Sequence, residues 1–316
     1  MFLKEWLKQG EVRLAAGPHA ERARADSELL LMQIVGRNRA YLIAHSDKLL
    51  SVEEAARYEA FIERRANGEP IQQITGEQEF YRMSFQVTSD VLIPRPETEL
   101  LVERVIHLMP LFHPKSEQFF SFRIIRTGSG AKKRRDDVGN LEVAGWPPRV
   151  LDVGTGSGAI AISIAHDWSE AEITAIDLSP AALEVARGNA ERLGFADCIR
   201  FLQGDLLAPV AGERFEIVVS NPPYVAEADR ESLSVEVRDY EPALALFAGD
   251  DGLEVHRRLI PAAFDALIPG GFVVLEIGCG QSAAITELLA RSGFEQIEFV
   301  PDLQGILRVA CAQRPI

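Results

Sequence analysis

The spacing of hydrophobic side chains changes character along the chain. Up to about residue 70, these side chains recur at helical intervals, and one Leu-rich helix is expected from about Ala25 to Val35, with Gly36 at its end. A second helix is expected to begin at the capping box Ser51–Glu54 and to stop at Gly68. The pattern therefore predicts a small helical amino-terminal domain over residues 1–75.

A short proline-containing segment separates this region from the rest of the chain. Polar and apolar side chains alternate over residues 77–88, which predicts a β-hairpin. The prolines of Ile93–Pro96 exclude the interior of a helix, so residues 76–96 are expected to form a hairpin and a linker. Beyond the linker, the apolar spacing predicts a helix from Glu97 to about Leu108.

From about residue 149 onward, apolar runs of strand length alternate with helical stretches. This alternation predicts a doubly wound α/β sheet, a fold that binds ligands at the carboxyl ends of its strands. We assign residues 97–316 to this second domain, and we expect its last two strands to form an antiparallel hairpin at the sheet edge. The predicted strands are Arg149–Val153, Glu172–Asp177, Ile199–Leu202, Phe215–Ser220, Gly271–Ile277, Gln296–Val300 and Ile306–Cys311.

Residues 111–147 fit neither pattern. They combine scattered aromatic side chains with the small-residue stretch Thr127–Gly130 and the basic run Lys132–Arg135. Loops of this length without periodicity are usually flexible or functional. We therefore predict a flexible surface insertion here.

The composition mainly excludes classes of protein. With 316 residues, 47% of them hydrophobic and 25% charged, the chain can bury a sizeable core in two domains. We find no secretory signal and no apolar run long enough to cross a bilayer. The cysteines Cys198, Cys279 and Cys311 are widely spaced and form no CxxC pair, so we expect neither a disulfide framework nor a metal site. These features favour a cytoplasmic protein.

The net charge of −14 limits the choice of partner. Proteins that bind long nucleic acids usually present a basic face, because binding displaces counterions from phosphates. Residues 1–85 hold 12 basic and 13 acidic side chains, whereas residues 86–316 hold 21 and 34. The acidic surplus therefore disfavours extended DNA or RNA as a substrate.

A glycine-rich turn follows the first predicted strand and leads into a helix over Ala159–Ala165. Glycines allow a sharp turn and let a ligand lie against the backbone, and the helix amino terminus adds unpaired N–H donors. Asp177 ends the next strand, where its carboxylate can accept both hydroxyl groups of a ribose. The expected cofactor-binding turn comprises Gly154, Thr155, Gly156, Ser157 and Gly158.

Two classes of cofactor fit this turn. Gly154, Gly156 and Ala159 also satisfy the dinucleotide pattern GxGxxA, in which Asp177 would be the ribose acid of a dehydrogenase. Asp152, just before the turn, favours S-adenosylmethionine. A carboxylate at that position suits a ligand with an ammonium and a sulfonium group better than it suits a pyrophosphate.

The tetrapeptide Asn221-Pro222-Pro223-Tyr224 leaves the carboxyl end of the strand predicted over 215–220. The side-chain oxygen of Asn221 and the carbonyl oxygen of Pro222 can each accept one N–H of a planar NH2 group. The two prolines stiffen the turn, and the ring of Tyr224 can stack on the substrate plane. Because the methyl donor is already activated, positioning can supply much of the acceleration and no strong base is required. We therefore predict N-methylation of an amide or exocyclic amine, with Asn221, Pro222 and Tyr224 as catalytic residues.

Asp205 and Leu206 follow the strand predicted over 199–202. Asp205 is placed to meet the amino group of an adenine, and Leu206 is placed to pack on its ring. A polar residue that only caps a loop would give the same pattern.

The motifs from Asp152 to Gly158, at Asp177 and over residues 221–224 resemble those of amino-methyltransferases, which have a seven-stranded Rossmann-like α/β sheet. The surrounding sequence resembles, more narrowly, the release-factor glutamine methyltransferases, which also have a small helical amino-terminal domain. The resemblance covers nearly the whole chain apart from residues 111–147. Two further segments of this chain are similar to segments of that family: the linker Leu92–Glu99, and Tyr240–Leu244 followed by Gly249–Leu253.

This resemblance implies S-adenosylmethionine-dependent N5-methylation of the glutamine in the Gly-Gly-Gln motif of peptide chain release factors. By position it implies that Gly154–Gly158, Asp177, Leu206 and Asn221 bind the cofactor, and that Asn221–Tyr224 bind the glutamine side chain. It also assigns substrate recognition to the helical domain. Two positions depart from the family pattern: Ala248 stands where glycine is expected, and Leu206 stands where an aromatic residue is common.

Several alternatives stay open at this point. A flipped adenine (N6) or guanine (N2) offers the same planar amine, although the acidic charge disfavours nucleic acid. A ribosomal-protein glutamine methyltransferase differs mainly at Arg95-Pro96-Glu97. A dehydrogenase would leave residues 221–224 unexplained, and a non-catalytic adaptor would not need both motifs. The expected partner is a release factor, bound by a monomer without membrane attachment.

Overall fold

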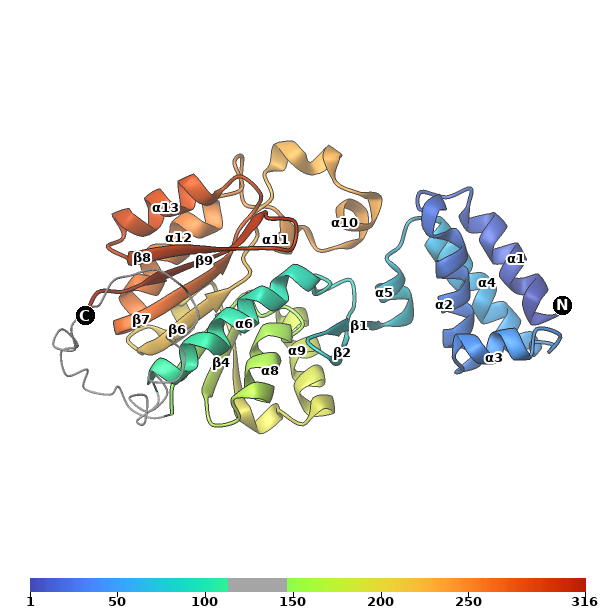
Figure 1. Ribbon diagram of the computed structural model, residues 1–316, viewed down its shortest axis with the longest axis horizontal. Coiled ribbons are helices and arrows are strands. Elements are labelled where there is room, and N and C mark those ends of the chain that lie inside the picture. Colours follow the sequence, from blue (N-terminus) through green and yellow to red (C-terminus); the bar gives the residue numbers. More distant parts are fainter. Residues whose placement is uncertain (113–146) are drawn as a thin grey trace, which may run out of the picture. The chain divides into compact units, whose positions relative to one another are not determined.

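The structure is a computed structural model that describes residues 1–112 and 147–316 (Figure 1). Residues 113–146 of the predicted insertion lie outside the described residues. The chain divides into two compact units. The helical unit comprises Met1–Gln78, Gln86–Ile93 and Asp229–Ala243, and the sheet unit comprises Glu79–Phe85, Pro94–Ala228 and Leu244–Ile316.

The helical unit packs amphipathic helices around one apolar core. That core contains Leu3, Leu30, Tyr58 and Ile62, all of which are buried. The capping box is confirmed, because the Glu54 N–H donates to Ser51 Oγ at 3.1 Å and the Ser51 N–H donates to Glu54 Oε2 at 2.7 Å. The helices are α1 (Leu3–Leu14), α2 (Ala23–Val35), α3 (Arg39–Ala44), α4 (Val52–Ala66) and α5 (Ile71–Thr75), and α2 ends at the left-handed Gly36 as predicted.

A segment from late in the sequence belongs to the helical unit. It contains the helix α10 (Val235–Tyr240). Its Tyr240 hydroxyl donates to the Asn67 carbonyl at 3.0 Å, and the Gln73 side chain donates to the Tyr240 carbonyl at 3.2 Å. Glu236 forms an ion pair with Arg65. The sequence pattern did not indicate this membership, because residues 229–243 lie between elements of the sheet.

The predicted hairpin is confirmed as β1 (Glu77–Phe80) and β2 (Met83–Gln86). Tyr81 and Arg82 make its two-residue turn, and both have positive φ (49° and 63°), as the tight turns that suit a twisted hairpin require. The helix expected from Glu97 begins two residues later, as α6 (Glu99–Leu108), because Pro96–Thr98 form a 3₁₀ turn first.

The sheet unit contains the predicted α/β sheet of seven strands. Their order is β5-β4-β3-β6-β7-β9-β8, and β9 runs in the opposite direction to the other six strands. β8 and β9 form the expected antiparallel hairpin, with β9 inserted beside β7 and β8 at the edge. The strands are β3 (Arg149–Val153), β4 (Glu172–Asp177), β5 (Ile199–Gln203), β6 (Phe215–Ser220), β7 (Leu267–Glu276), β8 (Glu295–Pro301) and β9 (Leu307–Gln313).

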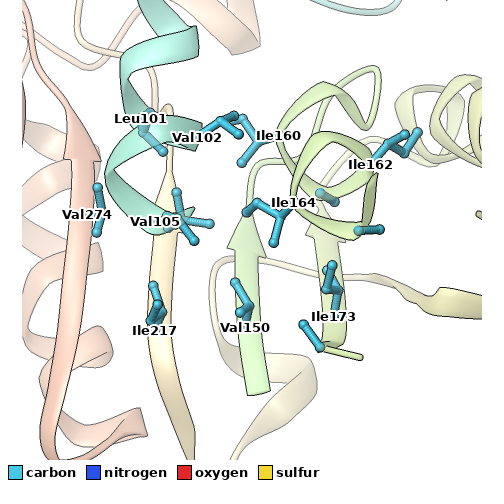
Figure 2. Packing of buried hydrophobic residues seen from close by; sticks show 14 of the residues in the cluster. Leu101, Val102, Val105, Val150, Ile160, Ile162, Ile164, Ile173, Ile217 and Val274 are labelled. Carbon is cyan, nitrogen blue, oxygen red and sulfur yellow. The ribbon is translucent and has the colours of Figure 1, made fainter. Parts of the chain in front are cut away.

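Helices cover both faces of this sheet (Figure 1). On one face, Leu101 and Val105 of α6 and Ile164 of α8 lie over the sheet residues Val150 and Ile217 (Figure 2). This face is covered by α6, α8 (Ala159–Asp167) and α9 (Pro180–Leu193), and the other by α12 (Glu254–Ala266) and α13 (Ser282–Arg291). Burial on both faces explains the continuous apolar runs of the parallel strands. Among the described helices, none is long and apolar enough to cross a bilayer.

Candidate active site

The adjacent parallel strands β3, β6 and β7 end at the same level, at the carboxyl-terminal side of the sheet. The strand order reverses beside β3, since β4 lies on one side of it and β6 on the other. Val153 pairs with Ser220, and Ser220 pairs with Leu275. The residues that follow, Gly154 and Asn221, therefore leave neighbouring strands at the same level. Such a reversal point is where open α/β sheets bind ligands.

The glycine-rich turn is held by backbone hydrogen bonds to β4. The N–H groups of Gly154 and Thr155 both donate to the Ile176 carbonyl, at 2.8 and 3.0 Å. Gly154 and Gly156 have φ of 74° and 55°, and a Cβ added at either would meet no atom within 4 Å. Gly158 differs, because its Cβ would lie 3.2 Å from that of Ala186. The first two glycines thus leave open space against the backbone, whereas Gly158 permits close helix packing.

Asp152 is a completely buried carboxylate beneath this turn. Its Oδ2 accepts a hydrogen bond from Thr155 Oγ1 at 2.6 Å, while Oδ1 is buried without a hydrogen-bond partner among the described residues. Burial raises the pKa of Asp152 to about 7. The hydrogen bonds from Thr155 and from the Ala161 N–H oppose the rise, and the nearby Asp177 carboxylate adds to it. A buried carboxylate with an unpaired oxygen is matched to a cationic ligand.

Asp177 ends β4 and faces the same turn. Its two oxygens accept hydrogen bonds from the backbone N–H groups of Gly156 (2.8 Å) and Ser179 (2.9 Å). Burial raises its pKa, although these backbone hydrogen bonds oppose the rise. Each carboxylate oxygen keeps a further lone pair with which to accept a hydroxyl group.

The structure separates the environments of Asp205 and Leu206. The exposed carboxylate of Asp205 forms an ion pair with Arg258 of α12. Leu206 has φ of 50°, a rare conformation for a leucine, and its side chain packs against the apolar cluster on the α12 face of the sheet. An adenine amino group would therefore compete with Arg258 for Asp205.

The tetrapeptide 221–224 is anchored by side chains outside it. Asn221 Nδ2 donates to Thr98 Oγ1 at 3.2 Å, and the Tyr224 hydroxyl donates to Glu276 Oε1 at 3.2 Å. The Tyr224 carbonyl accepts a hydrogen bond from Gln281 Nε2 at 3.0 Å. Because Nδ2 of Asn221 is committed to Thr98, its Oδ1 is the atom left to accept from a substrate.

The segment Gly249–Leu253 packs closely against the tetrapeptide. Gly252 has φ of 72°, and a Cβ there would lie 2.3 Å from the Tyr224 carbonyl oxygen, so only glycine fits. Ala248, where the sequence comparison suggested glycine, has negative φ, is buried and donates its N–H to the Val225 carbonyl. An alanine therefore fits this position without backbone strain.

Thr98 and Glu276 are polar residues of this site that our sequence reasoning did not select. Both are buried, and Thr98 Oγ1 donates to Glu276 Oε2 at 2.7 Å. Burial raises the pKa of Glu276 to about 7. His256 of α12 contacts the Glu276 carbonyl through Nε2 at 3.1 Å, and burial lowers its pKa to about 4, so the ring is neutral at pH 7. One signal was present, because Glu276 is a charged residue inside an apolar run.

No cluster of metal-ligating side chains occurs within residues 1–112 and 147–316. The three cysteines are free thiols, with Cys311 buried and Cys279 exposed. The cofactor-binding and substrate-binding roles predicted for residues of this site stay predictions at this point.

Comparison with known proteins adds independent findings. The chain matches two family models, described as the PrmC N-terminal domain over residues 5–76 and the methyltransferase small domain over residues 138–237. Three curated proteins, all named release factor glutamine methyltransferase, align over nearly their full length. The one from Koribacter versatilis is 39% identical and covers 92% of this chain and 91% of its own. Those from Moorella thermoacetica and Escherichia coli are 39% and 34% identical, over 99% and 96% of this chain and 99% and 95% of their own.

Proposed function

This chain belongs to the release factor glutamine methyltransferase family, and from this premise we propose that it methylates N5 of the glutamine in the Gly-Gly-Gln motif of peptide chain release factors. The observation that carries the proposal is the position of the Asn221–Tyr224 turn. It leaves β6 at the level where the glycine-rich turn leaves the neighbouring β3.

The residues at the end of β3 fit S-adenosylmethionine. When bound, this cofactor supplies a methyl group on a positively charged sulfur, already activated for transfer. The unpaired Oδ1 of Asp152 suits the ammonium group of such a ligand, and Asp177 suits its ribose hydroxyls. The open space beside Gly154 and Gly156 allows the ligand to lie against the backbone. We assign Thr155, Ser157 and Gly158 to the same binding turn, with Asp205 and Leu206 toward the adenine.

The tetrapeptide fits a carboxamide NH2 group. Asn221 Oδ1 and the Pro222 carbonyl provide two acceptors, one for each N–H bond, which fixes the orientation of the nitrogen. Pro223 adds rigidity, and the Tyr224 ring offers a flat apolar surface to the amide plane. The nitrogen would gain the methyl group as the bond from that methyl to the sulfonium breaks, leaving a neutral thioether, and would lose one proton to solvent. The chain therefore needs to supply orientation more than a base.

The charge of the chain supports a protein substrate over a nucleic acid. The net charge is −14, which opposes binding to the phosphates of long DNA or RNA. We propose that residues 1–75, together with residues 229–243 of the same helical unit, recognise the release factor. Residues 76–96 act as a linker, the rest of residues 97–316 acts as the catalytic domain, and the enzyme acts as a cytoplasmic monomer.

One labelling experiment tests the proposed function. The purified chain is incubated with methyl-labelled S-adenosylmethionine and one of four acceptors: a release factor, the same factor with the Gly-Gly-Gln glutamine changed to glutamate, ribosomal proteins, or duplex DNA. We expect label only in the unaltered release factor. Label in DNA or in ribosomal proteins, or equal label in the altered factor, would contradict the proposal.

A further inference from the structure

A continuous chain of hydrogen bonds links the two ends of the tetrapeptide through residues outside it. It runs from the Tyr224 hydroxyl to Glu276, from Glu276 to Thr98, and from Thr98 to Asn221, over 3.2, 2.7 and 3.2 Å. Thr98 and Glu276 are 4% and 2% exposed, so water does not compete for these hydrogen bonds. The two residues lie 178 positions apart in sequence.

While Glu276 is ionised, chemistry fixes the direction of each hydrogen bond. An ionised carboxylate only accepts, so both hydroxyls that contact Glu276 must donate to it. Once the Thr98 hydroxyl has donated its single proton to Glu276, its oxygen can only accept from Asn221. The amide of Asn221 must then present Nδ2 to Thr98, because the alternative orientation would place two acceptors against each other.

We propose that Glu276 and Thr98 are positioning residues that set the amide orientation of Asn221, so that its oxygen and not its NH2 faces the substrate nitrogen. This inference rests on the proposed methylation of a carboxamide. With the amide reversed, Asn221 would present N–H donors to the N–H donors of the glutamine, and the acceptor pair would be lost. Glu276 also holds the Tyr224 hydroxyl, so one carboxylate orients both ends of the tetrapeptide.

Protonation of Glu276 would weaken this control. A protonated carboxyl group can donate to Thr98, which frees the Thr98 hydroxyl to donate to Asn221 Oδ1 and permits the reversed amide. Burial raises the pKa of Glu276 to about 7, Glu97 opposes its ionisation, and Arg308 and the hydroxyls of Thr98 and Tyr224 favour it. His256 faces only its backbone carbonyl and is neutral at pH 7. We therefore expect the active orientation to weaken as the pH falls below about 7.

Two substitutions at one position separate the hydroxyl from the methyl group of Thr98. T98V keeps the shape and removes the hydroxyl, while T98S keeps the hydroxyl and removes the methyl. With release factor as substrate, we expect kcat of T98V to fall about 100-fold, as for a misplaced catalytic group, with an unchanged KM for S-adenosylmethionine. We expect T98S to stay within about threefold of the wild-type kcat, because the chain of hydrogen bonds is intact.

A third variant tests the charge. Thr98 and Tyr224 donate to different oxygens of Glu276, and E276Q replaces one of those oxygens with an NH2 group, so one of the two hydroxyls would face a donor. The kcat of the wild type, measured with saturating cofactor, should fall as the pH is lowered through about 7. E276Q should have a low kcat at every pH and should lack that fall.

The outcomes distinguish this inference from the proposed function. The acceptor that the wild type labels tests the function, whereas the ratio between variants on that acceptor tests the inference. Wild-type kcat in T98V, or equal losses in T98V and T98S, would overturn the role of the hydroxyl. An E276Q profile with the same acidic fall as the wild type would overturn the role of Glu276. Melting temperatures of T98V and E276Q close to that of the wild type give the folding control.

Discussion

A buried charged side chain in the helical unit and one in the sheet unit differ in how fully the protein supplies their hydrogen-bond partners. In the helical unit, the guanidinium of Arg65 is almost fully buried and donates to Asp26 (2.7 Å) and to the Glu69 carbonyl (2.9 Å), and it also pairs with Glu236. In the sheet unit, Asp152 is equally buried, yet one of its oxygens has no hydrogen-bond partner within the described part of the chain. Arg65 is satisfied by the protein itself, whereas one oxygen of Asp152 has no partner within residues 1–112 and 147–316, as expected if this carboxylate binds a ligand.

A structural buried charge and a functional one differ in whether the protein itself supplies all the partners. A buried ion that is paired on all sides locks a local arrangement, and removing one partner leaves the others uncompensated. A buried carboxylate without a cation destabilises the folded chain, and it is retained where a ligand supplies the missing partner. Substitutions in the two units should therefore have opposite effects on stability.

The largest expected effect is loss of stability in Arg65→Met. This change leaves the buried Asp26 carboxylate without its main partner, and we expect the free energy of unfolding to fall by about 3–5 kcal/mol. Urea denaturation of the unliganded protein measures it. Arg64→Met is the matched control, because Arg64 is 41% exposed and its ion pair with Glu69 should contribute less than about 1 kcal/mol. Equal losses of unfolding free energy in the two variants would contradict the structural role assigned to the buried Arg65.

A second large effect is expected on catalysis in Asn221→Ala. Removal of an acceptor at the reacting nitrogen should lower kcat by about 100-fold, equivalent to about 3 kcal/mol. Cofactor affinity, measured by calorimetry, should fall far less than kcat. A variant that turns over release factor at the wild-type rate would exclude this role for Asn221.

Asp152→Asn is expected to have effects of intermediate size and opposite sign on cofactor affinity, which falls, and on stability, which rises. Loss of the carboxylate should weaken S-adenosylmethionine binding by about 2 kcal/mol, roughly 30-fold. The same change should raise the stability of the unliganded protein at pH 8, because a buried unpaired charge is removed. Calorimetry and urea denaturation measure the two quantities. Asp197→Asn, at an exposed position, should change neither, and a destabilised Asp152→Asn would contradict the ligand-binding interpretation.

The last expected effect is a graded dependence of stability on pH. The pKa of Asp152 is raised from 3.8 to about 7 in the folded chain, so the folded state binds its proton more tightly than the unfolded state. Stability of the unliganded protein should therefore be highest below about pH 4 as far as this group is concerned, and the contribution is lost as the pH rises to about 7. Glu276, whose pKa is also raised to about 7, adds to this trend.

Cofactor affinity should depend on pH in the opposite direction. If the ammonium group binds the ionised Asp152, affinity should fall by up to about tenfold for each pH unit below about 7. Calorimetric titrations between pH 5 and 8 test this, and Asp152→Asn should flatten the dependence. A wild-type affinity that does not change over this range would show that the carboxylate does not meet the cation.

Much of the fold was predictable because burial imposes strong patterns. β3, β4 and β6 have the predicted ends, since parallel strands buried on both faces give unbroken apolar runs. The start of β7 was placed at Gly271 instead of Leu267, because Pro269-Gly270-Gly271 resembles a turn. The chain remains extended there, with a register irregularity between Phe215 and Ile217 of the neighbouring β6.

The residues of the site were predictable only where they lie together in one continuous segment of sequence. The glycine-rich turn and the tetrapeptide are contiguous, so their residue types and spacing reveal them. Thr98 and Glu276 depend on a contact between distant segments, and no local pattern joins them. The same reason explains why residues 229–243 were not assigned to the helical unit, since the partners of Tyr240 and Glu236 lie more than 160 positions earlier in the chain.

The membership of residues 229–243 in the helical unit has a consequence for engineering. The polypeptide passes between the two units after residues 78, 85, 93, 228 and 243, so neither unit is a single continuous piece of sequence. A chimera that takes only its first 76 residues from a relative would set a foreign bundle against the native Glu236 and Tyr240. If the helical unit recognises the release factor, as proposed, both fragments have to be transplanted together to exchange release-factor preference between relatives.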